Sequence, residues 1–233
     1  MQERLLYEGK AKRVYATSDP QQVVVEFKDD ATAFNGMKRG QIAGKGEVNA
    51  AMSVRLFRLL ADHGMATHFR QQLDARRLLT DYLRMVPLEV VVRNRVAGSL
   101  QKRTGLPEGT ELAEPVVEFY YKNDALGDPL LNGDHIRILQ LASPDRVARL
   151  RADALGINHV LTGFLADRKL LLVDFKLEFG MVDDVLKLGD EISPDTCRLW
   201  DRDSLTKLDK DRFRQDLGDV EGAYQEVLRR VLS

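Results

Sequence analysis

Charged and apolar residues alternate along one stretch of this chain, residues 169–180, and this alternation constrains the fold most strongly. Asp174, Lys176 and Glu178 occupy every second position, and apolar residues lie between and around them. Because the side chains of a β-strand point alternately to opposite faces, this spacing predicts a strand with one charged and one apolar face. The apolar face requires a hydrophobic core, so the charged face lies beside that core.

A second strand is expected directly after the first. Residues 185–188 are mostly apolar, and the short segment 181–184 predicts a hairpin. Glu178 and Asp190 would then face one another, and two adjacent carboxylates repel unless a cation lies between them. Mg²⁺ prefers such oxygen ligands. The alternative is a solvated hairpin in which Lys176 and Lys187 neutralise the acids, and the pattern alone does not separate the two interpretations.

The composition indicates an ordinary globular protein and excludes several classes. A length of 233 residues suits one large domain or two smaller lobes. The net charge of -1 gives no overall attraction to nucleic acid or to an anionic membrane. The single cysteine, Cys197, excludes an intrachain disulfide and a cysteine-based zinc site, and it favours a reducing cytoplasm. No apolar run approaches the ~18 residues that a membrane span needs, so we expect no membrane partner.

The first segment, residues 5–15, predicts a hairpin with a small basic turn. Apolar residues flank a turn that contains Gly9, Lys10, Ala11 and Lys12. Small residues let the backbone approach a ligand closely and the lysines supply positive charge, so the turn could cover phosphate groups. The alternative is a solvated basic turn. Further along, the sequence predicts a glycine-spaced basic loop over 38–45 and a helix over 46–63.

Pro87 marks the predicted boundary between two lobes, residues 1–86 and 87–233. Met85 lies in the connector just before it. The strand that resumes after the proline leads to Arg93, with Ser99 shortly beyond. Arginine offers a planar fork for a carboxylate or a phosphate, so this strand end suits an anion. The alternative is that the arginines pair with nearby acids.

Phosphoryl transfer needs cations for phosphate oxygens and carboxylates for Mg²⁺, and the chain supplies both kinds of group. No Ser-His-Asp elbow, zinc-ligand spacing or dinucleotide-binding glycine motif is present. Asp174 and Phe175 resemble the start of the metal-binding motif of protein kinases. Lys176 replaces the glycine of that motif, however, and a protein kinase is therefore disfavoured. Another small-molecule kinase and a non-catalytic nucleotide-binding module stay as alternatives.

Several segments in one order carry a resemblance to a known family. They are YEGKAKRVY (7–15), FKDDATAFNG (27–36), GKGEVN (44–49), VVRNRVAGS (91–99), LVDFKLEFG (172–180), LGDEISPD (188–195), RLWD (198–201) and DKDRFR (209–214). Over nearly its whole length the sequence resembles the SAICAR synthetases of purine biosynthesis. The resemblance implies an ATP-dependent ligase that joins L-aspartate to 5-amino-1-(5-phosphoribosyl)imidazole-4-carboxylate and releases ADP and phosphate, through an acyl phosphate.

The resemblance also implies a fold and a set of ligands. The expected fold is of the α+β or α/β class with two lobes: an antiparallel-sheet lobe that binds ATP and a larger mixed α/β lobe, an architecture that resembles protein kinases and ATP-grasp enzymes. ATP and Mg²⁺ are the expected cofactors, and the imidazole nucleotide carboxylate and L-aspartate are the expected partners. We expect no nucleic acid, no membrane and a cytoplasmic location, and a homodimer is one assembly that the sequence allows.

Individual roles follow from the resemblance as well. The residues expected to bind ATP are Gly9, Lys10, Ala11, Lys12, Met85, Lys122, Glu178 and Asp190. Glu178 and Asp190 would also hold Mg²⁺. The imidazole nucleotide would bind Arg93, Ser99, Arg198 and Arg214, and the reacting centre would be lined by Asp174 and Lys176. The residues that bind aspartate are not assigned.

Overall fold

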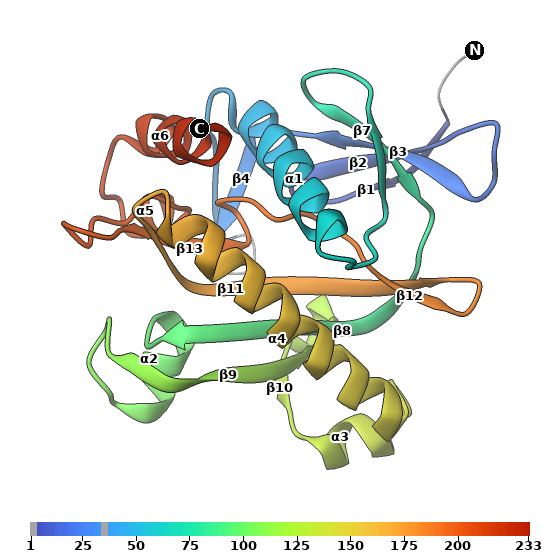
Figure 1. Ribbon diagram of the computed structural model, residues 1–233. Helices are drawn as coiled ribbons and strands as arrows, with labels where there is room; N and C mark the ends of the chain where they lie inside the picture. Colours follow the sequence, from blue (N-terminus) through green and yellow to red (C-terminus); the bar gives the residue numbers. More distant parts are fainter. Residues whose placement is uncertain (1–3, 34–36) are drawn as a thin grey trace.

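The computed structural model describes residues 4–33 and 37–233. Residues 34–36, the end of the segment FKDDATAFNG that contributes to the family resemblance, lie outside the described residues. Two antiparallel sheets and three long helices make up most of the described part (Figure 1). The expected mixture of helices with antiparallel sheets is therefore confirmed.

The first sheet of the described chain has five strands in the order β1-β2-β3-β7-β6, all antiparallel. The strands are β1 (Leu5–Glu8), β2 (Lys12–Ala16), β3 (Gln22–Phe27), β6 (Phe69–Gln72) and β7 (Arg77–Asp81). The predicted N-terminal hairpin is confirmed: the Gly9 backbone N–H donates to the Lys12 carbonyl oxygen at 2.8 Å and closes the turn. The basic turn thus projects from the edge pair of this sheet.

The second sheet of the described chain carries the charged strand in its middle. Its order is β10-β9-β8-β11-β12, and β13 pairs with residues 170–175 of β11. The strands are β8 (Arg84–Arg95), β9 (Glu111–Tyr121), β10 (Leu130–Leu131), β11 (Leu170–Val182), β12 (Val185–Leu188) and β13 (Cys197–Asp201). The predicted hairpin is confirmed as β11 and β12, but its turn is shorter than the expected segment 181–184, because Met181 and Val182 still pair with β12.

The prediction that Pro87 interrupts the strand is wrong, because β8 runs through it. The register between β8 and β11 shifts between Glu178 and Gly180, and Pro87 lies in β8 beside this irregularity. A proline lacks the N–H that a regular ladder needs, so it is tolerated where the ladder is already broken. The chain passes from the first sheet to the second between Asp81 and Arg84.

Residues 38–41 also differ from the prediction of a basic loop. They form β5 (Lys38–Gln41), which pairs with β4 (Asp30–Ala33) in a small two-stranded sheet. The strand packs through its lysine and its glycine. The Lys38 Nζ atom lies 4.9 Å from the centre of the Phe213 ring, and a Cβ atom on Gly40 would lie 3.0 Å from the same ring. A distant aromatic side chain thus stabilises a segment with little strand propensity.

Three long helices cover the sheets, and short helices connect the strands. The long ones are α1 (Lys45–Asp62), α4 (Pro144–Ala166) and α6 (Val220–Leu232), and the short ones are α2 (Gly98–Thr104), η1 (Asp124–Leu126), α3 (Gly133–Ile138) and α5 (Asp211–Arg214). The Ser143 side chain accepts a hydrogen bond from the Arg146 N–H and thereby caps the start of α4. In Figure 1, α4 crosses the second sheet and α6 lies beside α1.

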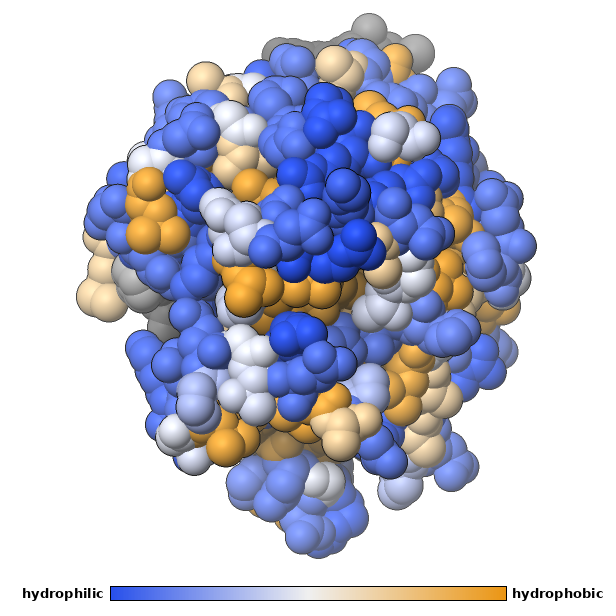
Figure 2. Space-filling view, turned by 60° about the vertical axis from the view of Figure 1, so that its left-hand side comes forward, coloured by the Kyte–Doolittle hydropathy of each residue, from blue (hydrophilic) through white to orange (hydrophobic). Residues whose placement is uncertain are grey.

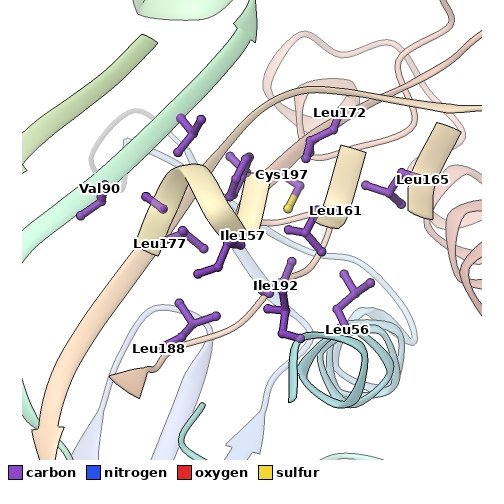
Figure 3. Packing of buried hydrophobic residues seen from close by; sticks show 14 of the residues in the cluster. Leu56, Val90, Ile157, Leu161, Leu165, Leu172, Leu177, Leu188, Ile192 and Cys197 are labelled. Atoms are coloured by element: carbon purple, nitrogen blue, oxygen red, sulfur yellow. The ribbon is translucent and has the colours of Figure 1, made fainter. Parts of the chain in front are cut away.

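The main hydrophobic core lies between α4, α1 and the apolar face of the second sheet. In Figure 3, Ile157 and Leu161 of α4 point between Leu177 of the sheet and Leu56 of α1. The apolar positions of the alternating strand, including Phe175 and Phe179, belong to this core. The charged positions of the strand therefore lie on the opposite face, as the alternation predicts.

The outer surface is mostly polar. On the face shown in Figure 2, hydrophilic residues predominate and hydrophobic residues form separate patches. Among the described helices, none is long and apolar enough to cross a membrane.

Candidate active site

The charged face of β11 is buried, although its residues are ionisable. Asp174 and Glu178 are each only 3% exposed. In the ladder between β8 and β11, Asp174 lies opposite Arg93 and Glu178 lies opposite Glu89. The carboxylates are therefore not solvated, and Lys187 pairs with Asp81 at 2.6 Å and not with the hairpin acids. Lys176 does pair with Glu178, at 2.6 Å, as the alternative interpretation expected.

Three lysines surround the carboxylates at one end of this face. We call these lysines and the carboxylates that they contact the lysine cluster. Lys12 pairs with Asp190, and its Nζ atom lies 3.0 Å from Glu191 Oε1. Lys122 pairs with Glu178. The third lysine, Lys176, lies 2.6 Å from Glu178 Oε1 and 3.8 Å from Asp190 Oδ2. The start of β2, the hairpin with the residues that follow it, and the end of β9 thus meet at one point.

The charges in the lysine cluster support one another. Burial disfavours the charged form of Lys12, but Asp190 and Glu191 outweigh it and raise the pKa of this lysine above its ordinary value. Burial likewise opposes ionisation of Asp190, but Lys12 and Lys176 hold the pKa of this carboxyl well below its ordinary value. The pair is therefore ionic at neutral pH.

The backbone fixes the two carboxylates that were predicted to hold a metal. The Gly189 N–H donates to the Glu178 carbonyl oxygen at 2.8 Å, and Asp190 follows with a left-handed backbone, φ 56°. Mg²⁺ is usually held by one or two carboxylates together with phosphate oxygens, and this pair matches that donor set. Within residues 4–33 and 37–233, no group of three or more His, Cys, Asp or Glu residues is arranged to hold a metal ion. The pair therefore suits a metal that phosphate ligands complete.

Arginines and acids alternate at the other end of the face, in what we call the arginine cluster. Arg93 donates to Asp174 Oδ2 at 2.7 Å and to Ser99 Oγ at 2.9 Å. Arg198 donates to the same Asp174 oxygen at 2.8 Å and to Asp211 Oδ2 at 2.7 Å. The Arg214 Nη1 atom lies 2.5 Å from the other oxygen of Asp211. The alternative that these arginines pair with nearby acids is thus correct in this structure.

The same arginines also line a cavity of about 340 Å³. Predicted residues among its lining are Arg93, Ser99, Asp174, Lys176, Arg198 and Arg214. Burial disfavours the charged form of Arg198, but Asp174 and Asp211 outweigh it and raise the pKa of its guanidinium. Ion pairing and exposure to a cavity therefore coexist, and the cavity presents three guanidinium groups to an anion.

The remaining predicted residues lie beyond this cavity. Lys10 pairs with Asp124 at 2.9 Å on an exposed part of the surface, and Gly9 packs beside the ring of Tyr7. Met85 lies within β8 opposite Gly180 and not in a free connector. A Cβ atom on Gly180 would lie 3.1 Å from the Met85 sulfur, so this glycine permits the methionine to approach the hairpin that carries Glu178.

Several residues in and around the site escaped the sequence analysis. Glu118 pairs with Arg93 at 2.7 Å. The period of two along β9 places Glu118 and Tyr120 on one face, and this is a signal that could have been used. No local sequence pattern predicts the buried ion pair of Lys45 and Asp195, in which Nζ lies 2.8 Å from Oδ2. Asp195 lines the cavity, and its other oxygen accepts a hydrogen bond from the Tyr224 hydroxyl at 2.6 Å.

Cys197 also lines the cavity, but its thiol is not activated. Burial raises the pKa of Cys197 to about 12. A thiol nucleophile needs a lowered pKa. The surroundings of Cys197 therefore do not favour a role as a nucleophile.

Comparison with known proteins identifies the family. The family model described as SAICAR synthetase matches residues 5–231. A phosphoribosylaminoimidazole-succinocarboxamide synthase of Synechococcus sp. (strain JA-2-3B'a(2-13)) is 58% identical over 233 residues, which cover 99% of this chain and 94% of the relative.

Solved structures agree with this match. The synthase of the same name from Ehrlichia chaffeensis superposes with a TM-score of 0.96 at 42% identity and 98% coverage of both chains. A SAICAR synthetase solved in complex with ADP superposes with a TM-score of 0.95 at 50% identity, covering 98% of this chain and 97% of that one. These matches confirm the resemblance and the enzyme class expected from it, and the chain belongs to the SAICAR synthetase family.

Proposed function

We propose that this chain uses ATP to join L-aspartate to 5-amino-1-(5-phosphoribosyl)imidazole-4-carboxylate, and that it does so through an acyl phosphate. The observation that carries the proposal is the arrangement of two charged clusters on one sheet face. The lysine cluster suits a nucleotide with its metal, the arginine cluster suits a second anionic substrate, and Lys176 belongs to both. Two anionic substrates bound to these two clusters would therefore lie side by side.

The nucleotide would lie at the lysine cluster. A relative that is 50% identical was solved with ADP, which supports nucleotide binding here. Gly9, Lys10, Ala11 and Lys12 would cover the phosphates from the basic turn. Lys122 would add a charge from the position directly after β9. Met85 would lie beside the adenine, in the part of β8 that precedes the pairing of β8 with β9, which begins at Leu88.

Glu178 and Asp190 would hold Mg²⁺ together with phosphate oxygens. The metal supplies positive charge that neutralises the phosphates. The protein supplies the orientation of the two carboxylates, which the Gly189 to Glu178 backbone hydrogen bond fixes. In the lysine cluster three lysines face four carboxylates, Glu89, Glu178, Asp190 and Glu191, so an excess of negative charge attracts the cation.

The imidazole nucleotide would occupy the cavity. Arg93, Arg198 and Arg214 would bind its phosphate and carboxylate, and Ser99 would donate a further hydrogen bond. Asp174 orients the first two arginines by accepting from both. Lys176, at the border of the two clusters, would lie beside the carboxylate that reacts.

The chemistry requires activation because a carboxylate is a poor acylating agent. A carboxylate oxygen of the imidazole nucleotide attacks the γ-phosphorus of ATP, and ADP leaves. The amine of L-aspartate then attacks the carbonyl carbon, the bond to the phosphate oxygen breaks, and the nitrogen loses a proton as the amide forms. Positioning and charge stabilisation are the contributions expected of the protein.

The organisation of the chain fits this division of labour. We propose that residues 1–86 form the nucleotide-binding lobe and residues 87–233 the lobe that binds the imidazole nucleotide and the metal, with a cytoplasmic location and a homodimeric assembly. The change of sheet between Asp81 and Arg84 supports a boundary in this region. The packing of α6 against α1 links the C-terminal segment to the first part of the chain.

The test is ADP release from Mg-ATP and the imidazole carboxylate nucleotide, with and without L-aspartate, with the product analysed by mass. Aspartate-dependent ADP release with a new amide supports the proposal. ADP release without aspartate and a stable phosphorylated product would instead indicate a small-molecule kinase. The Asp190→Asn variant should lose nearly all Mg-ATP use and keep its fold, and wild-type turnover in it would refute the metal assignment.

A further inference from the structure

Lys176 is shared by three carboxylates, and one of them has no role in the proposed reaction. The Lys176 Nζ atom lies 2.6 Å from Glu178 Oε1, 2.9 Å from Glu89 Oε1 and 3.8 Å from Asp190 Oδ2. Glu178 and Asp190 are the proposed metal ligands. Glu89 comes from the neighbouring strand β8, directly opposite Glu178 in the ladder.

The three carboxylates are not equivalent once the nucleotide and its metal bind. A divalent cation held by Glu178 and Asp190 would compete with Lys176 for these carboxylates and would repel the ammonium group. Lys12 and Lys122 can transfer to the phosphates that arrive with the metal. Lys176 lies further toward the cavity, so it needs an anion of its own if it is to stay there.

Glu89 meets that need by its position. It lines the cavity on the same strand as Arg93, four residues away on the same face. Its side chain is 19% exposed, so its charge is only partly screened by water. Among the described residues, the only ion-pair partner recorded for Glu89 is Lys176.

We propose that Glu89 is a positioning residue that holds the Lys176 ammonium in the cavity when Mg²⁺ and the nucleotide occupy Glu178 and Asp190. This inference rests on the proposed function. Lys176 then changes from a shared partner of three carboxylates to a partner of Glu89 and of the substrate carboxylate. Glu89 acts through Lys176 and needs no contact with the metal or the substrate.

The test compares binding with and without the nucleotide, by calorimetry, in wild type and in Glu89→Gln, Lys176→Met and the double variant. The probes are Mg-ADP and the imidazole carboxylate nucleotide. With saturating Mg-ADP, we expect Glu89→Gln to weaken binding of the imidazole nucleotide by about tenfold, the loss of one charge-assisted contact. Without Mg-ADP, the effect should be about twofold or less, because Glu178 and Asp190 still hold Lys176.

Two comparisons separate positioning from a general structural effect. In the double variant, the loss should equal that of Lys176→Met alone, since Glu89 acts only through this lysine. Glu89→Asp should restore part of the affinity, and Glu114→Gln, on an exposed part of β9, should bind like wild type. Equal effects with and without Mg-ADP, or losses that multiply in the double variant, would overturn the inference.

The metal assignment is read from the same titrations. If Glu89→Gln weakens Mg-ADP binding itself, Glu89 is a metal ligand and the positioning role is wrong. If Asp190→Asn binds Mg-ADP like wild type, or if wild type does not bind the imidazole nucleotide, the proposed function fails and this inference fails with it. Normal Mg-ADP binding by Glu89→Gln, weak binding by Asp190→Asn and an unchanged imidazole affinity would refute the role of Glu89 alone.

Discussion

Replacing Asp174 by asparagine tests the electrostatic core of the site. The asparagine side chain keeps the shape of the aspartate but carries no charge. In the structure, Asp174 is 3% exposed and accepts hydrogen bonds from Arg93 and Arg198 at 2.7 and 2.8 Å. The Arg93 side chain is only 3% exposed. The substitution therefore leaves two guanidinium groups, one of them deeply buried, without their shared anion.

The expected loss in the free energy of unfolding depends on which carboxylates still contact each arginine. Removing one partner of a buried ion pair costs about 3–5 kcal/mol. Glu118 still lies 2.7 Å from Arg93, and Asp211 still lies 2.7 Å from Arg198, so the lower end, about 3 kcal/mol, is expected. For a chain of this size, each kcal/mol shifts Tm by about 2–4 °C, so Asp174→Asn should lower Tm by about 6–12 °C.

Thermal unfolding followed by circular dichroism measures this shift. The matched control is Asp153→Asn, which removes an ion pair to Arg149 within α4, where the arginine side chain is 68% exposed. Such a pair contributes about 0.5 kcal/mol or less, so Tm should change by no more than about 2 °C. If the two variants show the same small shift, the arginine cluster is effectively solvated and the argument from burial is wrong.

Three further predictions concern single residues. Arg214→Ala should raise the KM for the imidazole nucleotide about tenfold or more and leave the KM for ATP unchanged. If only the KM for ATP rose, Arg214 would bind ATP and its assignment to the imidazole nucleotide would be wrong. Cys197 should not react with a thiol reagent at pH 8 in the native protein and should react after unfolding, because burial raises its pKa to about 12; rapid native labelling would contradict this. Burial lowers the pKa of His68 to about 4, so the unfolded chain takes up a proton first, and stability should fall by up to ~3 kcal/mol as the pH drops from ~6.5 to 4. Urea unfolding of His68→Asn should show a shallower loss over that range, and equal slopes would refute the prediction.

Local patterns predicted those parts of the fold in which each residue contacts its sequence neighbours. The alternation around Asp174 predicted the buried strand β11, and the sequence of residues 46–63 predicted the helix α1. The prediction failed for β5, whose Lys38 and Gly40 pack against the ring of Phe213. A contact between segments that lie so far apart in the sequence leaves no periodic trace in either of them.

Contacts between residues far apart in the sequence also explain why the role of the arginines could not be decided from the sequence. Residue types near Arg93 indicated an anion, but whether the anion was a ligand or a protein carboxylate could not be decided, because Asp174 lies 81 residues away. The structure shows that the two interpretations were never exclusive. Each arginine that lines the cavity has a carboxylate partner that holds it in place, and a guanidinium with five donors can keep that partner and still bind a substrate oxygen.

The lysine cluster follows a different rule, and the difference has a mechanistic consequence. An ammonium group carries its three donors on a single nitrogen, so Lys12 or Lys176 must exchange part of its contact with protein carboxylates to bind a phosphate or a substrate carboxylate. Binding at the arginine cluster can therefore add contacts to a preformed network, whereas binding at the lysine cluster must rearrange one. Nucleotide affinity should accordingly respond more steeply than imidazole nucleotide affinity to substitutions of Glu178 and Asp190, the carboxylates that release the lysines.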